Sequence, residues 1–297
     1  VVNPILKQGK DPSVVSSYRP ISLTSVLSKI MERLVTDRLS YVMESEKIFT
    51  NIQSGFRKHR CTTDHILKLQ DEINKNIHFK KHTLAVFIDF NSAFDMLWCK
   101  GLLVKLNSYG IVGNIYNYIE NFLSDRTMQV RIDQAYSSVH HLENGTAQGS
   151  IISPLLFLIM INDLPNSLFN VEASLFADDS CIYKSGKNLP ALVECIQQNL
   201  INLQTWCDRW GFNISLEKTT AVLFTYRHEN IPCNLRLKEG FIKFEKTAKF
   251  LGVIFDRKLT WKAHISYIIE KCKKRLNLMR MVSGQFWGAT KTPPFDL

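Results

Sequence analysis

Residues 171–184 read VEASLFADDSCIYK, and this stretch decides the fold. Two apolar runs flank Asp178 and Asp179, as in a β-hairpin with a polar tip. Aspartate is common at hairpin tips, so the pair taken alone would be ordinary turn chemistry. A second apolar strand elsewhere in the chain also carries an aspartate, and this makes a functional role for the pair a stronger hypothesis.

That second strand is predicted at residues 83–90, TLAVFIDF, an apolar run that carries Asp89 near its end. Such runs are typical of strands covered on both faces. An aspartate there is costly to bury without a partner. Three carboxylates at the ends of neighbouring strands repel one another unless cations lie between them, and Mg²⁺ prefers oxygen ligands of this type. Two such ions, about 3.5–4 Å apart, serve phosphoryl transfer, so the pattern predicts nucleotidyl transfer.

Long helices are predicted between the strands, which favours an α+β architecture. Residues 189–210 have a clean helical face, with Asn188 available as the N-cap. Further strands are predicted at 219–225 and 250–255. Apolar residues recur at helical spacing in an earlier segment: Leu23, Val26, Leu27, Ile30 and Leu34, a face that Leu39 and Val42 continue imperfectly.

Two further helices are predicted, one after residue 91 and one from Thr260 onward. Ser92 and Asp95 have the spacing of a capping box, so Asp95 is assigned to a helix start and not to a metal. The last helix is predicted to place one row of side chains inward and a basic row outward. The inward row is Ile265, Ile268, Ile269, Cys272, Leu276 and Met279, and the basic row is Lys271, Lys273, Lys274 and Arg275.

Seven motifs in a fixed order resemble those of reverse transcriptases. FIDFNSAFD (87–95), GTAQGSIISPLLF (145–157) and FADD (176–179) are similar to the family's catalytic motifs. The flanking motifs are similar in the form carried by non-LTR retrotransposons of the jockey-like, second-reading-frame type: YRPISL (18–23), QSGFRKHRCTTDH (53–65), WGFNISLEKT (210–219) and FLGVIFDRKLTW (250–261).

The resemblance implies a right-hand polymerase fold with an antiparallel palm sheet packed on helices. It places fingers at 1–80, a palm strand and helix start at 81–100, a fingers and palm connection at 101–145, the palm at 146–255, and the end of the primer grip with a truncated thumb at 256–297. The implied activity is RNA-directed DNA polymerisation, in which a primer 3′-hydroxyl attacks a dNTP with two Mg²⁺ ions bound, or Mn²⁺ as a substitute.

The resemblance also assigns residue roles. Asp89, Asp178 and Asp179 correspond to the metal-binding and catalytic carboxylates, and Lys218 to a lysine proposed to protonate the leaving pyrophosphate. Phe94 falls at the steric gate against the 2′-hydroxyl. The remaining nucleotide-binding positions are Arg57 for the triphosphate, Arg19, Gln148 and Gly149, and the primer grip is Phe250, Leu251 and Gly252.

Composition fits binding to a polyanion but does not require it. Residues 1–80 carry 13 basic against 8 acidic side chains, and residues 256–297 carry 9 against 3, whereas the middle is near neutral. Two basic arms around an acidic centre would suit nucleic acid; solvated lysines on exposed helices would explain the charges equally well. Seven scattered cysteines without a CxxC pair indicate reduced thiols.

The expected partners are an RNA template, a DNA primer and dNTPs, with an endonuclease domain elsewhere in a longer polyprotein. The opening VVN, without Met, suggests a piece of something longer. No apolar run reaches the roughly 20 residues that span a bilayer. An intracellular location is expected, in the nucleus or the cytoplasm.

Three alternatives stay open at this level. The chain could be a nucleic-acid-binding retroelement remnant that no longer polymerises. It could be a group II intron maturase-like or telomerase-like enzyme, since these share the carboxylates. It could also be another two-metal nucleotidyl transferase or cyclase that needs no primer.

Overall fold

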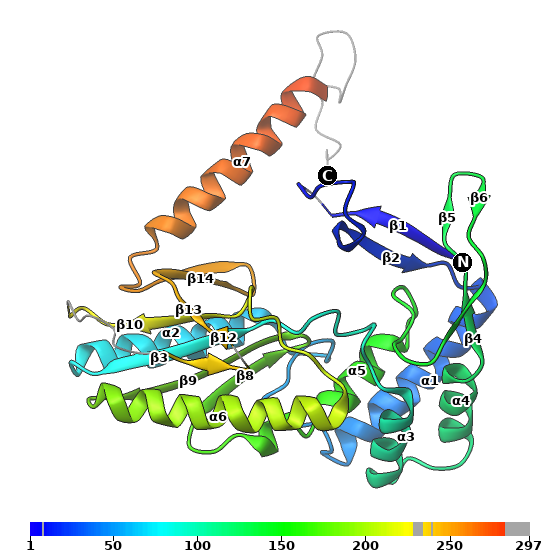
Figure 1. The fold of residues 1–297 in the computed structure, drawn as a ribbon, viewed down its shortest axis with the longest axis horizontal. Coiled ribbons are helices and arrows are strands. Elements are labelled where there is room, and N and C mark those ends of the chain that lie inside the picture. The colour runs from blue at the N-terminus through cyan, green and yellow to red at the C-terminus, as the bar shows by residue number, and fades with distance from the viewer. Residues whose placement is uncertain (8, 228–233, 239, 283–297) are drawn as a thin grey trace, which may run out of the picture.

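The computed structural model describes residues 1–7, 9–227, 234–238 and 240–282 (Figure 1). Cys233 and residues 283–297 lie outside the described residues. The helices are α1 Val26–Ser45, α2 Thr62–His78, α3 Cys99–Ser108, α4 Asn114–Leu123, α5 Ser153–Ile161, α6 Leu189–Trp210 and α7 Lys262–Val282, with short 3-10 turns at Val15–Ser17 and Leu164–Ser167. The strands are β1 Val2–Leu6, β2 Tyr18–Ser22, β3 His82–Ile88, β4 Arg126–Met128, β5 Arg131–Ile132, β6 Ala135–Tyr136, β7 His140–Leu142, β8 Glu172–Phe176, β9 Asp179–Gly186, β10 Thr220–Phe224, β11 Arg236–Leu237, β12 Gly240–Phe241, β13 Lys243–Phe244, β14 Thr247–Phe250 and β15 Val253–Asp256.

A five-stranded sheet in the order β13-β10-β3-β9-β8 forms the centre of the molecule. β3 is buried along its whole length between β9 and β10, antiparallel to both. Its register pairs Ile88 with Ser180, which brings Asp89 alongside the start of β9. β8 and β9 pair as far as Phe176 and Asp179, so a two-residue turn joins them.

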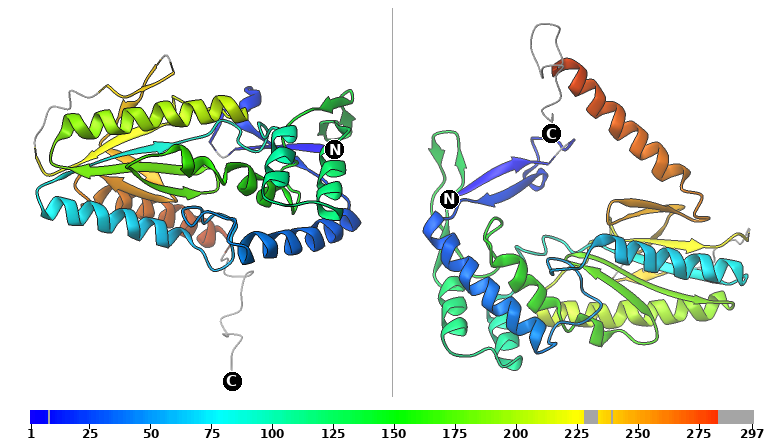
Figure 2. Two further views of the ribbon diagram at one scale, coloured as in Figure 1. Left: turned by 90° about the horizontal axis from the view of Figure 1, so that it is seen from below. Right: turned by 180° about the vertical axis from the view of Figure 1, so that it is seen from behind.

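Helices cover both faces of this sheet, and alternation along the strands divides the core in two. α6 packs on the face that holds Leu84 and Val86, whereas α2 and the β14–β15 hairpin pack on the face that holds Ala85 and Phe87. Figure 2 shows α6 and α2 on opposite sides. The sheet is therefore an internal layer, as the apolar run at 83–90 predicted.

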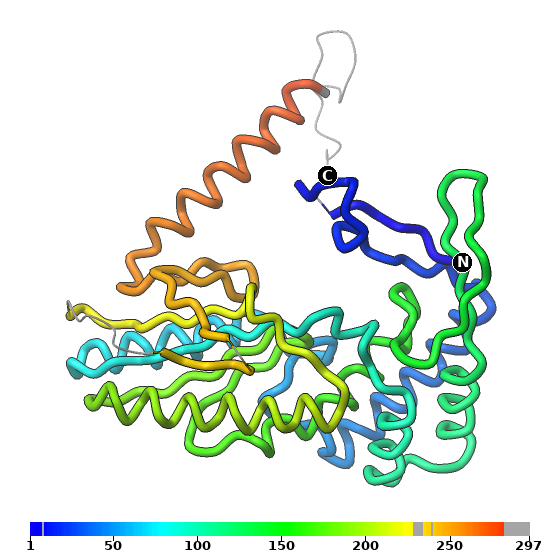
Figure 3. The backbone as a smooth tube through the Cα atoms, in the orientation of Figure 1, coloured from blue at the N-terminus to red at the C-terminus, as the bar shows by residue number. Residues whose placement is uncertain are grey.

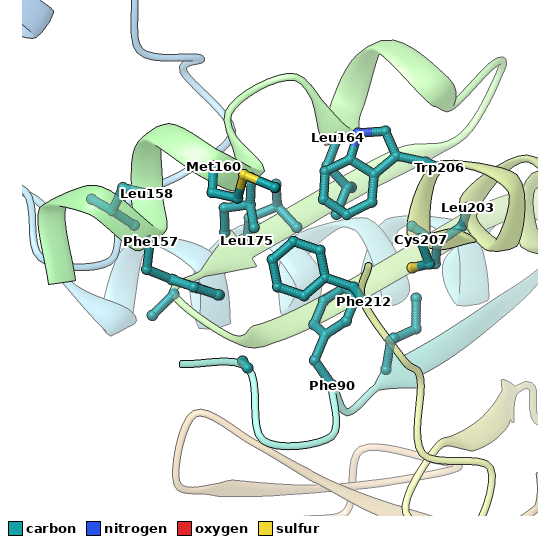
Figure 4. Close-up of a cluster of buried hydrophobic side chains, with 14 of the residues drawn as sticks. Phe90, Phe157, Leu158, Met160, Leu164, Leu175, Leu203, Trp206, Cys207 and Phe212 are labelled. Atoms are coloured by element: carbon teal, nitrogen blue, oxygen red, sulfur yellow. The ribbon is translucent and has the colours of Figure 1, made fainter. Parts of the chain in front are cut away.

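An aromatic cluster joins the sheet to α5 and α6 beside the end of β3 (Figure 4). The Phe212 ring stacks on Trp206 at 5.4 Å and contacts the ring of Phe90 edge-on at 5.9 Å. Phe157 of α5 completes the cluster at 6.2 Å from Phe212. Because these rings are buried, they fix the path of the chain immediately after Asp89.

The β1–β2 hairpin and α7 lie on the same side of the molecule, away from the helix-covered body (Figure 3). The hairpin is attached at its base, where the Ser22 amide donates to the Gln148 carbonyl (2.7 Å) and the Val2 amide to the Gln129 carbonyl (2.8 Å). No helix in the described part of the chain is long and apolar enough to cross a bilayer.

The predicted helix at 189–210 is confirmed with its bounds, and the Asn188 side chain accepts from the Ala191 amide as an N-cap. The face predicted around α1 is mostly exposed, with Leu27 at 77% and Ile30 at 56%. Of that face Leu39 is buried, together with Glu32, Val35 and Met43 of another side of the helix. Spacing therefore identified the helix but not the side that packs.

Two other predictions are corrected. The row predicted to lie inward on α7 is exposed, with Ile265 at 55% and Met279 at 67%, because α7 projects away from the sheet. The strand predicted at 250–255 is a hairpin, since Leu251 and Gly252 have positive φ angles and form the turn between β14 and β15.

Candidate active site

Three carboxylates lie together at one end of the sheet. Asp89 follows β3, Asp178 lies in the β8–β9 turn, and Asp179 begins β9. Desolvation, together with repulsion from Asp178 and Asp89, raises the pKa of Asp179 to about 6. The pKa of Asp178 is also raised, chiefly by desolvation, with Asp89 contributing and Lys218 opposing. The sheet thus holds an excess of negative charge that a cation would relieve.

Lys218 reaches this acidic group from the loop before β10. Its Nζ lies 3.1 Å from Asp89 Oδ1, and the side chains are 63% and 41% exposed, so the pair adds little stability. The backbone fixes the approach more firmly, because the Ser215 amide donates to the Asp89 carbonyl (2.8 Å) and the Thr219 hydroxyl accepts from the Asp89 amide (3.3 Å). The late lysine predicted from the sequence is therefore at the site.

A cavity of about 1060 Å³ opens in front of the carboxylates. It brings together most of the residues that the sequence predicted for nucleotide chemistry, although they come from five separate segments of the chain. The predicted residues that line it are Arg19, Asp89, Phe94, Gln148, Gly149, Asp178 and Lys218.

Phe94 forms part of the cavity wall, as expected of a steric gate. Its ring stacks on Phe157 at 4.9 Å and contacts Phe56 edge-on at 6.4 Å. The Thr146 amide donates to its carbonyl at 2.9 Å. A ring held from both sides is a rigid boundary, so substrate size at this wall is restricted.

Gln148 is held by Asp95 on the opposite side of the cavity. Its Nε2 lies 3.0 and 3.3 Å from the two Asp95 carboxylate oxygens. Burial raises the pKa of Asp95, and the Gln148 hydrogen bond partly offsets that. The capping role predicted for Asp95 is wrong: residues 91–96 form turns, and the next helix, α3, begins at Cys99.

The loop after Gln148 packs closely against the N-terminal hairpin. Gly149 has φ +115°, and a Cβ there would lie 2.8 Å from the Ser22 carbonyl oxygen, so glycine is required. The next residues are held by the buried Glu32 of α1, which accepts from the Ser150 hydroxyl and the Ile151 amide at 2.6 Å each. Sequence reasoning missed Glu32, since a lone glutamate in a helix resembles any exposed charge.

The basic side of the cavity comes from the β1–β2 hairpin. Lys7 and Lys10 line it together with the exposed Arg19. Neither lysine was predicted, although KQGK at 7–10, a glycine turn between two lysines, offered a signal for a basic loop.

The structure does not bring Arg57 to this cavity. Its side chain is 5% exposed and forms a two-pronged ion pair with Glu44, at 2.8 and 2.7 Å. Its Nη1 donates to the carbonyls of Thr50 and Gln53. These contacts give Arg57 a structural role between α1 and the following loop, and they do not support its predicted contact with a triphosphate.

The predicted primer grip lies apart from the cavity lining. Phe250 is buried against Phe87, with ring centroids 5.5 Å apart, while Leu251 and Gly252 form the exposed turn. A primer could therefore meet the backbone of this turn but not the Phe250 ring. The role in primer binding stays a prediction.

The donor set fits Mg²⁺ in kind. Hard carboxylate oxygens beside an open cavity suit an ion that keeps waters and shares substrate phosphates. Among the described residues, no group of three or more His, Cys, Asp or Glu side chains is arranged to hold a metal ion by itself. The residues therefore fit an ion completed by substrate better than a closed structural site.

Residues 5–255 match the family model described as reverse transcriptase (RNA-dependent DNA polymerase). The chain belongs to the reverse transcriptase family. It is 31% identical over 284 residues to the probable RNA-directed DNA polymerase from transposon BS, and 31% identical over 282 residues to the RNA-directed DNA polymerase from mobile element jockey, both of Drosophila melanogaster. Each match covers 93% of this reverse transcriptase and 31% of the relative, so the chain spans about a third of their length.

Solved structures support the same fold. Telomerase from Candida tropicalis in complex with a fragment of telomeric RNA superposes with a TM-score of 0.57 at 13% identity, covering 88% of this chain and 44% of that one. The apo telomerase of the same organism, truncated at its C-terminal domain, gives 0.56 at 12% identity, covering 83% and 52%. The reverse transcriptase therefore has the right-hand polymerase fold.

Proposed function

We propose that this chain is an RNA-directed DNA polymerase of a non-LTR retrotransposon, adding dNTPs to a primer 3′-hydroxyl. One observation carries the proposal: a single cavity combines two of the catalytic carboxylates, Phe94, Gln148 and four basic side chains. The likeness to the jockey and BS polymerases supports this element type over a maturase or a telomerase.

The acidic residues of the cavity would bind metal ions, and the basic residues would bind the phosphates of the nucleotide. Asp89, Asp178 and Asp179 would hold two Mg²⁺ ions, which supply charge neutralisation and activation of the primer hydroxyl in nucleotidyl transfer. Arg19, Lys7 and Lys10 face them across the cavity and bind the triphosphate, with guanidinium suited to two oxygens at once. Lys218, exposed beside Asp89, is placed to donate a proton to the pyrophosphate.

Phe94 and Gln148 set which nucleotide is accepted. The Phe94 ring, stacked on Phe157, would clash with a 2′-hydroxyl and so favour dNTPs. The Gln148 amide, which donates to Asp95, would contact the incoming nucleotide. Template bases are read by pairing, so protein contacts to the strands are mainly to backbone and sensitive to salt.

The larger organisation is part of the same proposal. Residues 1–80 serve as fingers, 81–100 and 146–255 as palm, 101–145 as the connection, and 256–297 as the start of the thumb. The turn at Leu251 and Gly252 holds the primer end. An endonuclease domain elsewhere in the polyprotein and an intracellular site of action complete the expectation.

The test is extension of a DNA primer annealed to an RNA template, with dNTPs and Mg²⁺, by the chain and its Asp178→Asn variant. Extension that disappears in the variant supports the proposal. Binding of primer-template without extension in either protein supports the remnant alternative. Product formation from a nucleotide without primer supports a cyclase or another transferase.

A further inference from the structure

The catalytic turn that carries Asp178 has an unfavourable backbone. Ala177 and Asp178 form the two-residue turn between β8 and β9, and Ala177 has φ +56°. Two-residue hairpin turns with a positive φ at the first position prefer glycine, because a Cβ is disfavoured there. Something outside the hairpin must hold Ala177 in this conformation.

The buried amide of Gln53 makes that contact. Gln53 is 0% exposed, its Oε1 accepts from the Ala177 amide at 3.0 Å, and its Nε2 lies 3.5 Å from the Ala177 carbonyl oxygen. The same Oε1 accepts from the Gly55 amide at 2.7 Å, which fixes the orientation of the side chain. Both backbone groups of one strained residue are therefore bound by one side chain.

The segment around Gln53 is aligned on the hairpin by its backbone. Gln53 forms a parallel bridge with Leu175, and the Ser54 amide donates to the Leu175 carbonyl at 3.0 Å. Gly55 lies so close that a Cβ there would collide with the Ala177 backbone nitrogen. The fit explains why glutamine and glycine stand two residues apart in QSG at 53–55.

We infer that Gln53 is a positioning residue that holds the Ala177–Asp178 turn and so aims the Asp178 carboxylate at the cavity. It touches no substrate and acts through the backbone. The inference rests on the proposed function, and it adds a residue 124 positions away in sequence to the group that sets catalytic geometry.

A matched control exists on α6, outside the cavity lining. Asn199 of α6 is 2% exposed and binds both backbone groups of Phe169 in the same way, accepting from its amide at 2.7 Å and donating to its carbonyl at 2.9 Å. Phe169 does not line the cavity. Asn199→Leu therefore removes a comparable buried clamp without touching the catalytic turn.

The experiment compares Gln53→Met with Asn199→Leu by single-turnover dNTP addition and by binding of Mn²⁺ alone, followed by electron paramagnetic resonance. Gln53→Met is expected to lower the rate constant about tenfold or more and to weaken Mn²⁺ binding by a similar factor, with dNTP affinity changed less. Asn199→Leu should leave both near the parent values.

The Ala177→Gly change added to Gln53→Met should restore part of the rate, because glycine adopts the turn without the clamp. If Gln53→Met does not fold, Gln53→Asn, which withdraws the amide by one methylene, carries the same expectation. Equal losses in the Gln53 and Asn199 variants, or none in the former, would overturn the inference. If the parent chain extends no primer, the proposed function fails. The comparison of Mn²⁺ binding between the variants still tests whether Gln53 positions the Asp178 turn.

Discussion

The acidic and basic walls of the cavity are built in opposite ways. The carboxylates stand on β3 and on the β8–β9 hairpin, strands packed between α2 and α6. The basic side chains stand on β1–β2, a two-stranded hairpin whose Ile5 and Leu6 are 55% and 41% exposed. The acidic wall is therefore preorganised by the core. The basic wall has few supporting contacts and is the part free to adjust to a substrate.

The largest expected effect follows from breaking the acidic wall. Asp89→Asn should lower the rate constant for adding one dNTP by about a thousandfold or more, because it removes charge where it is needed in the transition state. Primer-template affinity should stay within about twofold, since strand contacts lie elsewhere. Asp133→Asn is the matched control in rapid-quench kinetics: Asp133 has φ +52° in the β5–β6 turn, which Asn tolerates. A rate for Asp89→Asn like that of the control would remove Asp89 from the site.

The next largest effect is expected at Phe94, the aromatic part of the cavity wall, and concerns selection between ribonucleotides and dNTPs. Phe94→Ala should raise incorporation of ribonucleotides relative to dNTPs by about a hundredfold, because the stacked ring no longer excludes the 2′-hydroxyl. The selectivity is the ratio of kcat/KM for a matched rNTP and dNTP pair. Phe122→Ala, on the exterior helix α4, is the control. An unchanged ratio of kcat/KM in Phe94→Ala would mean that the ring only packs in the core and does not select the sugar.

The role of the basic wall in dNTP binding can be tested by comparing alanine variants of Arg19 and Arg57. Arg19→Ala should raise the KM for dNTP about tenfold, with a smaller change in kcat, since its guanidinium lines the cavity. Arg57→Ala should leave KM unchanged and lower the melting temperature, because Arg57 is buried in contacts with Glu44 and two carbonyls.

The opposite outcome of that comparison would be equally informative. A raised KM in Arg57→Ala, with no change in Arg19→Ala, would mean that the triphosphate binds where the sequence motif predicted and not where the cavity lies. Arg33→Ala on the exposed side of α1 controls for loss of one positive charge.

The smallest effect concerns pH and stability. The pKa of Asp179, raised from 3.8 to about 6 by desolvation and by its neighbours, means that the folded state binds this proton more tightly than the unfolded state. This carboxyl therefore destabilises the fold increasingly as pH rises from about 4 to 7. Asp179→Asn should raise the melting temperature by a few degrees at pH 7 and hardly at all at pH 4.

Mg²⁺ should act on the same group. Its stabilising effect on the parent chain is expected to grow as pH rises through about 6, and to be reduced in Asp179→Asn. Scanning fluorimetry with and without Mg²⁺ measures the melting temperature of the parent chain and of Asp179→Asn at each pH. Because both proteins contain the same histidines, the difference between their curves gives the contribution of Asp179. Parallel curves at every pH would argue against a cation near this carboxyl.

Two amphipathic helices show how far the sequence reaches. The same periodicity predicted α6 and α7, yet α6 packs on the sheet as expected and α7 exposes Ile265 and Met279. Periodicity identifies an apolar face, but not whether a partner is present. The carboxylates, Phe94, Gln148 and Lys218 were predictable because local motifs carry them.

The residues that sequence reasoning missed act through long-range contacts. Glu32 and Gln53 bind backbone groups more than a hundred positions away. No local pattern distinguishes Glu32 from a surface residue, and the motif that begins at Gln53 gave that residue no role. Lys7 and Lys10 reach the cavity only because their hairpin is attached to the Gln148 carbonyl. Arg57 shows the reverse case, where a motif predicted a ligand and the fold uses the guanidinium for packing.

The most direct test of the account measures nucleotide binding without chemistry. A DNA primer ending in a dideoxynucleotide, annealed to an RNA template, is mixed with the chain, Mg²⁺ and each dNTP in turn, and the lifetime of the complex is recorded. We predict that only the dNTP complementary to the template base prolongs the lifetime, and that Asp178→Asn abolishes this effect. Equal lifetimes with all four dNTPs, or the same prolongation in Asp178→Asn, would contradict it.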